Sequence, residues 1–319
     1  MNNQERRVVV AGGGGFIGRA LGRTLLAGGY QVVVLTRGSS RGPSASPDGP
    51  QPAFVTWDGL TSKGWGHLAD GAFALVNLAG ENIAGARWTP ERKRAIVDSR
   101  VLPGRAILQA ANEASVKPKA YIQASAVGFY GDTGEKAVDE SSPPGTGFLS
   151  EVCLKVEAST QDIEAMGVRR VVIRTGLVLG RGGGVLEKML PPFKFFLGGP
   201  FGDGNQGFPW IHLEDEIGAI VFLLENPETS GPYNLTAPEG VSNREFCRQL
   251  GRAVSRPCGL AVPSAVLRMA FGEMAEELFL TGCSAFPRRL MESGYVFQHP
   301  RLGEALRALF PRAHPANSN

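Results

Sequence analysis

The first 36 residues carry the feature that most restricts the fold. An apolar run from Arg7 to Gly12 leads directly into AGGGGFIG, after which apolar residues recur at positions 16, 17, 20, 21, 25 and 26. That spacing is typical of a helix, and Gly28 with Gly29 predicts its end. A Val-rich run, residues 31–36, follows at once. A strand, a glycine turn, a helix and a strand in about 30 residues predict a βαβ unit, and uninterrupted apolar strands indicate a parallel sheet covered on both faces.

Further apolar runs extend this pattern along the chain. Strands are expected at residues 53–57, 72–78, 120–125 and 169–175, and helices near 90–115 and 148–166 separate the later ones. This alternation predicts an α/β fold, a Rossmann-type doubly wound parallel sheet. Residues 38–52 are rich in Pro, Gly and Ser and are expected to form a mobile loop.

Three glycines, Gly12, Gly15 and Gly18, stand three residues apart between the first strand and the helix. The first permits a tight turn, the second lets a pyrophosphate approach the backbone, and the third lets the helix pack on the strand. Unpaired N–H groups at the helix N-terminus would hold the phosphates. The pattern predicts dinucleotide binding. The alternative is that the glycines are present only to form a turn. A Walker loop is excluded because Arg19 and Ala20 follow, not Lys and Ser or Thr.

The end of the second strand indicates which dinucleotide binds. An Asp or Glu about 20 residues after the glycines would hold the ribose hydroxyls of NAD, but this strand ends in Thr36 and Arg37. A carboxylate there would repel a 2′-phosphate, whereas a hydroxyl and a guanidinium can bind it. We therefore predict NADP as the cofactor, with Arg37 as an ordinary solvated residue as the alternative.

Later motifs resemble the extended short-chain dehydrogenase/reductase superfamily. Asn77-Leu78-Ala79-Gly80 is similar to that superfamily's turn beside the cofactor, and residues 125–131, SAVGFYG, resemble its Ser-rich strand end before a Tyr-Gly pair. Together with residues 174–180, 198–215 and 286–297, and GPYNL at 231–235, they resemble the atypical "epimerase family" branch. Some members of that branch carry a cell-division-inhibitor label.

The resemblance implies a set of cofactor contacts around the glycine turn. Asp58, at the end of the third strand, would contact the adenine edge, and Leu78 with Ala79 would pack along the cofactor. The predicted set comprises Gly12, Gly15, Phe16, Ile17, Gly18, Thr36, Arg37, Asp58, Leu78, Ala79, Gly80, Arg100 and Val178. No metal site is predicted, because the four cysteines form no Cys-x-x-Cys pair.

Enzymes of this superfamily normally use a Tyr-x-x-x-Lys pair, which the chain lacks at each of its five tyrosines. Alignment on superfamily relatives places Leu149 and Cys153 at the Tyr and Lys positions. Three catalytic candidates remain: Ser125, Glu81 and Arg100. Glu81 could instead cap a helix or form a salt bridge, and Arg100 could instead belong to a solvated basic helix face.

Four residues are predicted to face the substrate: Trp88, Tyr130, Trp210 and His212. Trp88 and Trp210 could form an apolar wall, although large aromatic residues usually belong to the core. A lone histidine such as His212 more often satisfies a core hydrogen bond. Cys153 is expected to be inert unless it is exposed beside a cation.

Composition narrows the range of partners and compartments. Lys+Arg 33 against Asp+Glu 30 gives a net charge of +3, which is no nucleic-acid footprint. The chain shows no secretory signal and no 18-residue apolar run, so no membrane partner is expected. We expect a cytoplasmic monomer or homodimer acting on an unknown small molecule.

Two domains are expected from the change in texture after residue 180, where short helices near 242–255, 263–280 and 302–310 begin to dominate. Residues 1–235 would form the NADP-binding domain, with 180–205 contributing to the substrate lobe, and residues 236–319 a small C-terminal cover. The leading interpretation is an atypical NADP-dependent oxidoreductase or epimerase. The alternative, favoured by the missing Tyr-x-x-x-Lys pair, is a non-catalytic NADP sensor or regulator, which the label of the branch would link to cell division.

Overall fold

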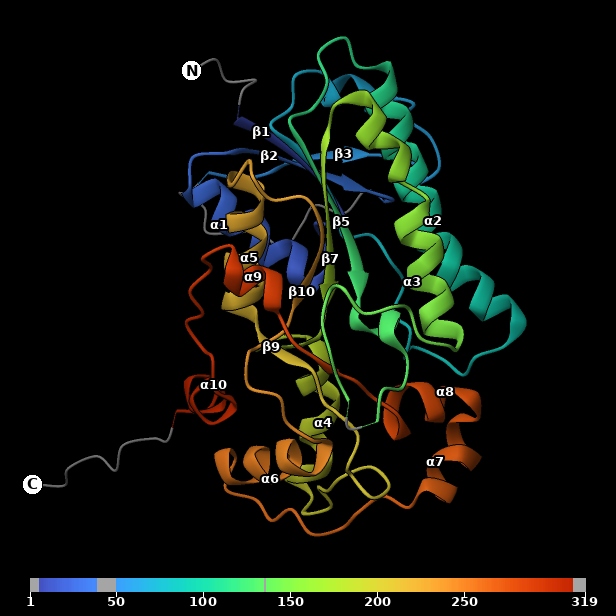
Figure 1. The fold of residues 1–319 in the computed structure, drawn as a ribbon, viewed down its shortest axis with the longest axis vertical. Helices are drawn as coiled ribbons and strands as arrows, with labels where there is room; N and C mark the ends of the chain where they lie inside the picture. The colour runs from blue at the N-terminus through green and yellow to red at the C-terminus, as the bar shows by residue number, and fades with distance from the viewer. Residues whose placement is uncertain (1–5, 39–49, 135, 312–319) are drawn as a thin grey trace, which may run out of the picture.

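The computed structural model describes residues 6–38, 50–134 and 136–311. A seven-stranded parallel sheet, ordered β10-β7-β5-β4-β1-β2-β3, forms its centre (Figure 1). The strands are β1 (Arg7–Ala11), β2 (Gln31–Thr36), β3 (Ala53–Thr56), β4 (Ala74–Asn77), β5 (Ala120–Ala126), β7 (Arg169–Thr175) and β10 (Gly231–Leu235). The predicted doubly wound parallel sheet is confirmed.

Helices cover both faces of this sheet, which explains why its strands are apolar on both sides. On one face α1 (Phe16–Ala27) packs beside α5 (Leu213–Glu225), and on the other α2 (Pro90–Glu113) packs beside α3 (Phe148–Ala158) (Figure 1). Neighbouring residues of β5 enter opposite cores: Ile122 joins the core under α1 and α5, and Tyr121 joins the core under α2.

A second group of elements lies below the carboxyl ends of the strands in Figure 1. There α4 (Gly184–Lys194), α6 (Asn243–Ala253) and α10 (Leu302–Leu309) share a core that includes Phe193, Phe246 and Leu306. The parallel pair β8 (Leu177–Leu179) and β9 (Trp210–His212) joins this group to the sheet. A further segment contains α7 (Ser264–Phe271), α8 (Glu273–Ala275) and the π-helical turn η5 (Glu276–Leu280).

Short elements complete the chain and tie the two parts together. The pair β6 (Ala137–Val138) and β11 (Ser284–Ala285) is parallel, and α9 (Arg288–Glu292) packs against β10. The remaining 3₁₀ helices are η2 (Gly66–Ala69), η3 (Val127–Tyr130) and η4 (Gln161–Met166).

Two helices expected from the sequence differ in the structure, and one expected loop lies mostly outside the described residues. The helix expected over 148–166 ends at Ala158, and η4 follows it. The helix expected over 263–280 is interrupted at Gly272, whose φ of 60° lies in the left-handed region. Most of the loop expected at 38–52 lies outside the described residues. No helix in the described part of the chain is long and apolar enough to cross a membrane.

The expected division at residue 235 coincides with the end of β10. Beyond it the chain does not stay in one lobe, because Leu290 of α9 is fully buried in the core beneath α1 and α5. The two-domain division stays a prediction.

Candidate cofactor and substrate site

The glycine turn after β1 is packed tightly against the turn after β4. Gly12 has φ of 79°, and a Cβ there would lie 2.6 Å from the carbonyl carbon of Leu78. The Leu78 N–H donates to the Ala11 carbonyl oxygen at 2.9 Å. A Cβ on Gly18 would lie 2.4 Å from the Gly12 carbonyl oxygen. Both positions therefore require glycine for the fold itself.

The middle of the turn is different, because it opens into a cavity of about 480 Å³ lined by Gly12, Gly14 and Gly15. A Cβ on Gly14 would meet nothing within 4 Å, and one on Gly15 would meet only the Gly12 carbonyl oxygen, at 3.2 Å. Gly15 is the N-cap of α1, and no described side chain caps that helix. Open backbone N–H groups at a helix start fit a pyrophosphate.

The far end of this cavity is formed by Thr36, Arg37, Trp57 and Asp58. Arg37 is exposed, and its aliphatic part lies beside Gly59. The Asp58 carboxylate accepts from the Leu60 and Thr61 N–H groups at 2.7 and 2.8 Å, and these bonds hold its pKa below the usual range. Asp58 thus orders the loop that forms this wall, and its predicted adenine contact stays a prediction.

Five members of the predicted cofactor set do not line this cavity: Phe16, Ile17, Gly18, Arg100 and Val178. Phe16 lies against the glycines at 180, 183 and 184, at each of which a Cβ would approach its ring within 3.0 Å. Val178 is buried in the core beneath α1 and α5. Their predicted contacts with a cofactor are untested.

A second cavity of about 540 Å³ lies at the carboxyl ends of β5 and β7. It shares Leu78, Ala79 and Gly80 with the first cavity. Arg100 and Ser125 line it, whereas Glu81 lines the first cavity only. Two of the three catalytic candidates therefore meet here.

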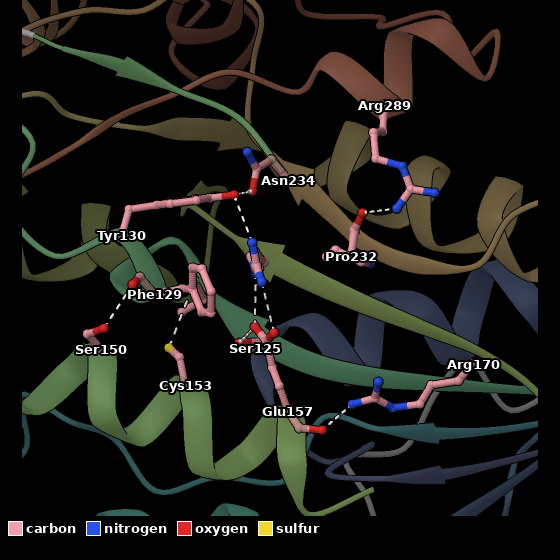
Figure 2. A network of polar contacts seen from close by, with 12 residues as sticks. Ser125, Phe129, Tyr130, Ser150, Cys153, Glu157, Arg170, Pro232, Asn234 and Arg289 are labelled. Atoms are coloured by element: carbon pink, nitrogen blue, oxygen red, sulfur yellow. Dashed lines mark hydrogen bonds and ion pairs between the residues drawn. The ribbon is translucent and has the colours of Figure 1, made fainter. Parts of the chain in front are cut away.

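Ser125 belongs to a buried polar network (Figure 2). Its Oγ donates to Glu157 Oε1 at 2.8 Å, and the Glu157 carboxylate is held by Arg174 through Nε at 3.0 Å and Nη2 at 2.9 Å. The side chains of Arg174 and Glu157 are 5% and 16% exposed, so this is a shielded ion pair. Because the Ser125 proton is directed at Glu157, the oxygen presents lone pairs rather than a proton to the cavity.

Arg100 supplies a cation to the same cavity from α2. Nη1 donates to the Ile96 carbonyl oxygen at 3.0 Å and Nη2 to that of Glu81 at 2.9 Å, and a Cβ on Gly80 would lie 3.0 Å from the guanidinium carbon. Burial lowers the pKa of Arg100, although such a group stays charged. The guanidinium is thus fixed beside the turn shared by the two cavities.

Glu81 is engaged elsewhere. Its carboxylate forms an ion pair with Arg92, and its backbone N–H donates to Ser99 Oγ at 3.1 Å. The salt-bridge alternative for Glu81 is thus the one that the structure shows, while a role in proton transfer stays untested.

The positions of the missing pair also line the second cavity. Leu149 and Cys153 both lie on α3, and the Cys153 thiol is 3.5 Å from the Ala126 carbonyl oxygen. Burial raises the pKa of Cys153, so the group remains a neutral thiol.

The four residues predicted to face the substrate line neither cavity. Trp88 packs edge-on against Phe148, and the Trp210 indole donates to the Glu239 carbonyl oxygen. Tyr130 Oη donates to Asn234 Oδ1 at 2.7 Å, and burial raises its pKa to about 12 (Figure 2). The geometry gives all of them, His212 included, a place in the core rather than on a cavity wall.

His212 instead caps α5, with Nδ1 accepting from the Glu214 N–H at 3.2 Å. Its ring lies 3.9 Å from that of His299, and with Glu214 these residues place possible metal-ligand atoms within 4.8 Å of one another. The Nδ1 lone pair is already used by the cap, whereas Nε2 of His212 is buried without a partner among the described residues.

Sequence reasoning missed four acidic or basic groups around the second cavity. Glu157 and Arg174 order Ser125, and Glu277 of η5 accepts from the Phe148 and Leu149 N–H groups at 2.7 Å each. Glu216 is completely buried, accepting from Thr175 Oγ1 at 2.9 Å, and its Oε2 has no partner among the described residues. The acidic run at 214–216 and Arg174 in RTGLVLG are visible in the sequence, but their contacts depend on the fold.

The fold and the glycine site define a class. Residues 8–236 match the model of the NAD dependent epimerase/dehydratase family, and the chain belongs to that family. Residues 262–309 match a domain of unknown function, DUF1731.

Particular relatives refine this assignment. The chain is 41% identical to epimerase family protein MT2273 of Mycobacterium tuberculosis over 299 residues, covering 94% of this chain and 96% of the relative. It is similar to the crystal structure of human epimerase family protein SDR39U1 with NADPH, with a TM-score of 0.84, 36% identity, and coverage of 96% and 100%. The atypical epimerase-family resemblance is confirmed.

A third structure has a more specific title. It is a nucleoside-diphosphate sugar epimerase from Corynebacterium glutamicum, with a TM-score of 0.75 and 31% identity. The match covers 99% of this chain but 60% of that one.

Proposed function

We propose that this protein binds NADP(H) and uses it in an atypical oxidoreductase or epimerase reaction on a small molecule. The observation that carries the proposal is the meeting of two cavities at Leu78, Ala79 and Gly80. One cavity offers open glycine backbone and Arg37, and the other offers Arg100 and Ser125. A dinucleotide lying across that turn would extend from the first cavity into the second.

The residues present fit the NADP expected from the sequence, and the human relative was crystallised with NADPH. Gly14 and Gly15 with the α1 N-terminus would hold the pyrophosphate, and Arg37 would pair with the 2′-phosphate. Bound NADP(H) would supply or accept a hydride. The residues from 236 onward, together with 180–205, would cover the substrate.

Arg100 is the side chain best placed to stabilise charge on a substrate oxygen. Its hydrogen bonds to Ile96, Ser99 and Glu81 use three of its five N–H groups. A cation from α2 thereby stands near Cys153, where the missing lysine of α3 would be. Ser125, with its proton directed at Glu157, would accept a hydrogen bond from a substrate hydroxyl and orient it.

The cofactor assignment is tested by charge removal. Arg37→Gln should lower NADPH affinity by about 10- to 100-fold and leave NADH affinity unchanged, since hydrogen bonds to charged groups contribute about 1.5–3 kcal/mol. Arg23→Gln removes the same charge from an exposed position of α1 and is the matched control. Calorimetry with both cofactors measures this, and an unchanged preference in Arg37→Gln would refute the role of Arg37.

A non-catalytic NADP sensor or regulator is the second candidate. It is favoured by the occupation of the Tyr and Lys positions by Leu149 and Cys153, and by the engagement of Ser125 with Glu157. Loss of NADPH absorbance on a panel of aldehydes and ketones separates the two. Turnover by NADPH-binding protein favours the enzyme, and its absence across the panel favours the sensor.

A further inference from the structure

The second cavity has largely apolar walls. Leu149, Val152 and Val156 of α3 line it, and so do Phe201, Leu278 and Phe279. Its volume of about 540 Å³ lies within the range of about 300–1,000 Å³ that is typical of ligand pockets. A ligand here would bury most of its surface against hydrocarbon.

The charges around this cavity are unsuited to an anion. Of the described residues that line it, Arg100 is the one cation, and the carboxylates of Glu277 and of Asp132, which is exposed, also line it. Arg100 uses part of its N–H groups on the Ile96 and Glu81 carbonyl oxygens, so it offers one partly used cation and no second one stands beside it in the described lining. A diphosphate brings two negative charges, and burying a charge without matched partners is costly.

The N-terminus of α3, which lies beside the cavity, is also occupied. The carboxylate oxygens of Glu277 each accept one N–H at the start of α3, from Phe148 and Leu149, at 2.7 Å. A Cβ on Gly147, where φ is 101°, would lie 3.0 Å from Glu277 Oε1. The place where a substrate phosphate or carboxylate could have used helix N–H groups therefore holds an anion of the protein itself.

The residue Gln206 adds a polar but uncharged side chain to the lining of the cavity. Gln206 Nε2 donates to the carbonyl oxygens of Phe201 and Phe279, and these bonds fix the orientation of the amide. The amide Oε1 is buried and has no partner among the described residues. Gln206 therefore brings no charge to the cavity that could bind an anion.

We propose that the second cavity takes an uncharged, mainly apolar carbonyl compound or its alcohol, without phosphate or carboxylate, and not a nucleotide sugar. The inference rests on the proposed function. In the reducing direction the carbonyl carbon gains a C–H bond from the hydride, the oxygen gains a proton from solvent, and NADPH is oxidised to NADP⁺. The substrate class named for the Corynebacterium structure does not extend to this chain.

The test compares a neutral ketone with a carboxylate that differs from it mainly in charge and with a nucleotide sugar, each added to protein saturated with NADP⁺ so that no ketone is reduced. The probes are 4-phenylbutan-2-one, its ring-carboxylated analogue 4-(3-oxobutyl)benzoate, and UDP-glucose, with affinities measured by ligand-observed NMR. We expect saturable binding of the neutral ketone and at least tenfold weaker binding of the carboxylate and of UDP-glucose. Equal or tighter binding of either anion, or no binding of the ketone, overturns the proposal.

A variant attributes the selectivity to its source. Glu277→Gln should narrow the ketone-to-carboxylate ratio several-fold, whereas Glu276→Gln, on the same turn but outside the cavity lining, should leave it unchanged. An unchanged ratio in a folded Glu277→Gln protein overturns the role of Glu277. The wild-type comparison stands even if that variant does not fold. Failure of the protein to bind NADP⁺ would instead refute the proposed function, and it is seen before any probe is added.

Discussion

The two cavities are built in opposite ways although they share Leu78, Ala79 and Gly80. The first is made of open backbone, with Gly14 and Gly15 at its floor and an exposed Arg37 at its end. The second is made of side chains that already satisfy one another, such as Ser125 with Glu157 and Glu277 with α3. The first cavity therefore offers groups that can bind a charged ligand, whereas the carboxylates of Glu157 and Glu277 beside the second already bind other groups of the protein.

The largest effect is expected where a side chain would enter the open backbone. Gly15→Val should abolish detectable NADPH binding while the protein stays folded, since a Cβ at Gly15 meets only the Gly12 carbonyl oxygen, at 3.2 Å. Calorimetry and thermal unfolding measure the two properties. Gly18→Ala is the contrasting variant and should destabilise the fold itself, because its Cβ would lie 2.4 Å from the Gly12 carbonyl oxygen. Normal NADPH affinity in Gly15→Val would mean that the glycines serve only to form the turn and do not bind the cofactor.

The next largest effect is expected on stability, at the shielded ion pair behind Ser125. Glu157→Ala leaves the Arg174 guanidinium, 5% exposed, without its counterion, and such a loss costs about 3–5 kcal/mol. Glu151→Ala is the control on the same helix, since its pair with Lys155 is exposed and should contribute less than about 1 kcal/mol. Urea unfolding provides both values. Similar losses for the two variants would mean that the Glu157 network is no more than a surface contact.

The sequence predicted the first cavity far better than the second, for a physical reason. Gly12, Gly15, Gly18 and Arg37 lie within one βαβ unit, so local spacing determines where they meet. Glu157 and Arg174 meet Ser125 only because β5 and β7 are neighbours in the sheet. Glu277 reaches Leu149 across 128 residues. No local pattern encodes such contacts. For the same reason the sequence could not show that Trp88 and Trp210, proposed for the substrate wall, lie in the core.

A smaller effect should appear in the pH dependence of stability. Burial raises the pKa of Glu216 to about 8, against an ordinary value of 4.5. Between these values the folded protein holds a proton that the unfolded chain releases, so this group stabilises the fold at low pH and loses that contribution as pH rises toward 8. Glu216→Gln should therefore gain stability relative to wild type with rising pH, by up to about 1.4 kcal/mol per unit. Urea unfolding at several pH values across this window measures the slope, and parallel curves for the two proteins would contradict it.

The smallest effect is expected at the position of the missing lysine. Cys153 is buried, its thiol is neutral because burial raises its pKa, and its contact is with the Ala126 carbonyl oxygen. Cys153→Ala should cost about 1 kcal/mol of stability from lost packing and change NADPH affinity less than about twofold, because binding in this view depends on the first cavity. On any substrate that the protein turns over, the rate should also persist, whereas loss of a true proton donor lowers it by about 10²–10⁴-fold. Calorimetry and NADPH absorbance test both statements. A fall of that size in Cys153→Ala would instead identify Cys153 of α3 as a proton donor. The second cavity, like the first, would then contain a group that acts directly on its ligand.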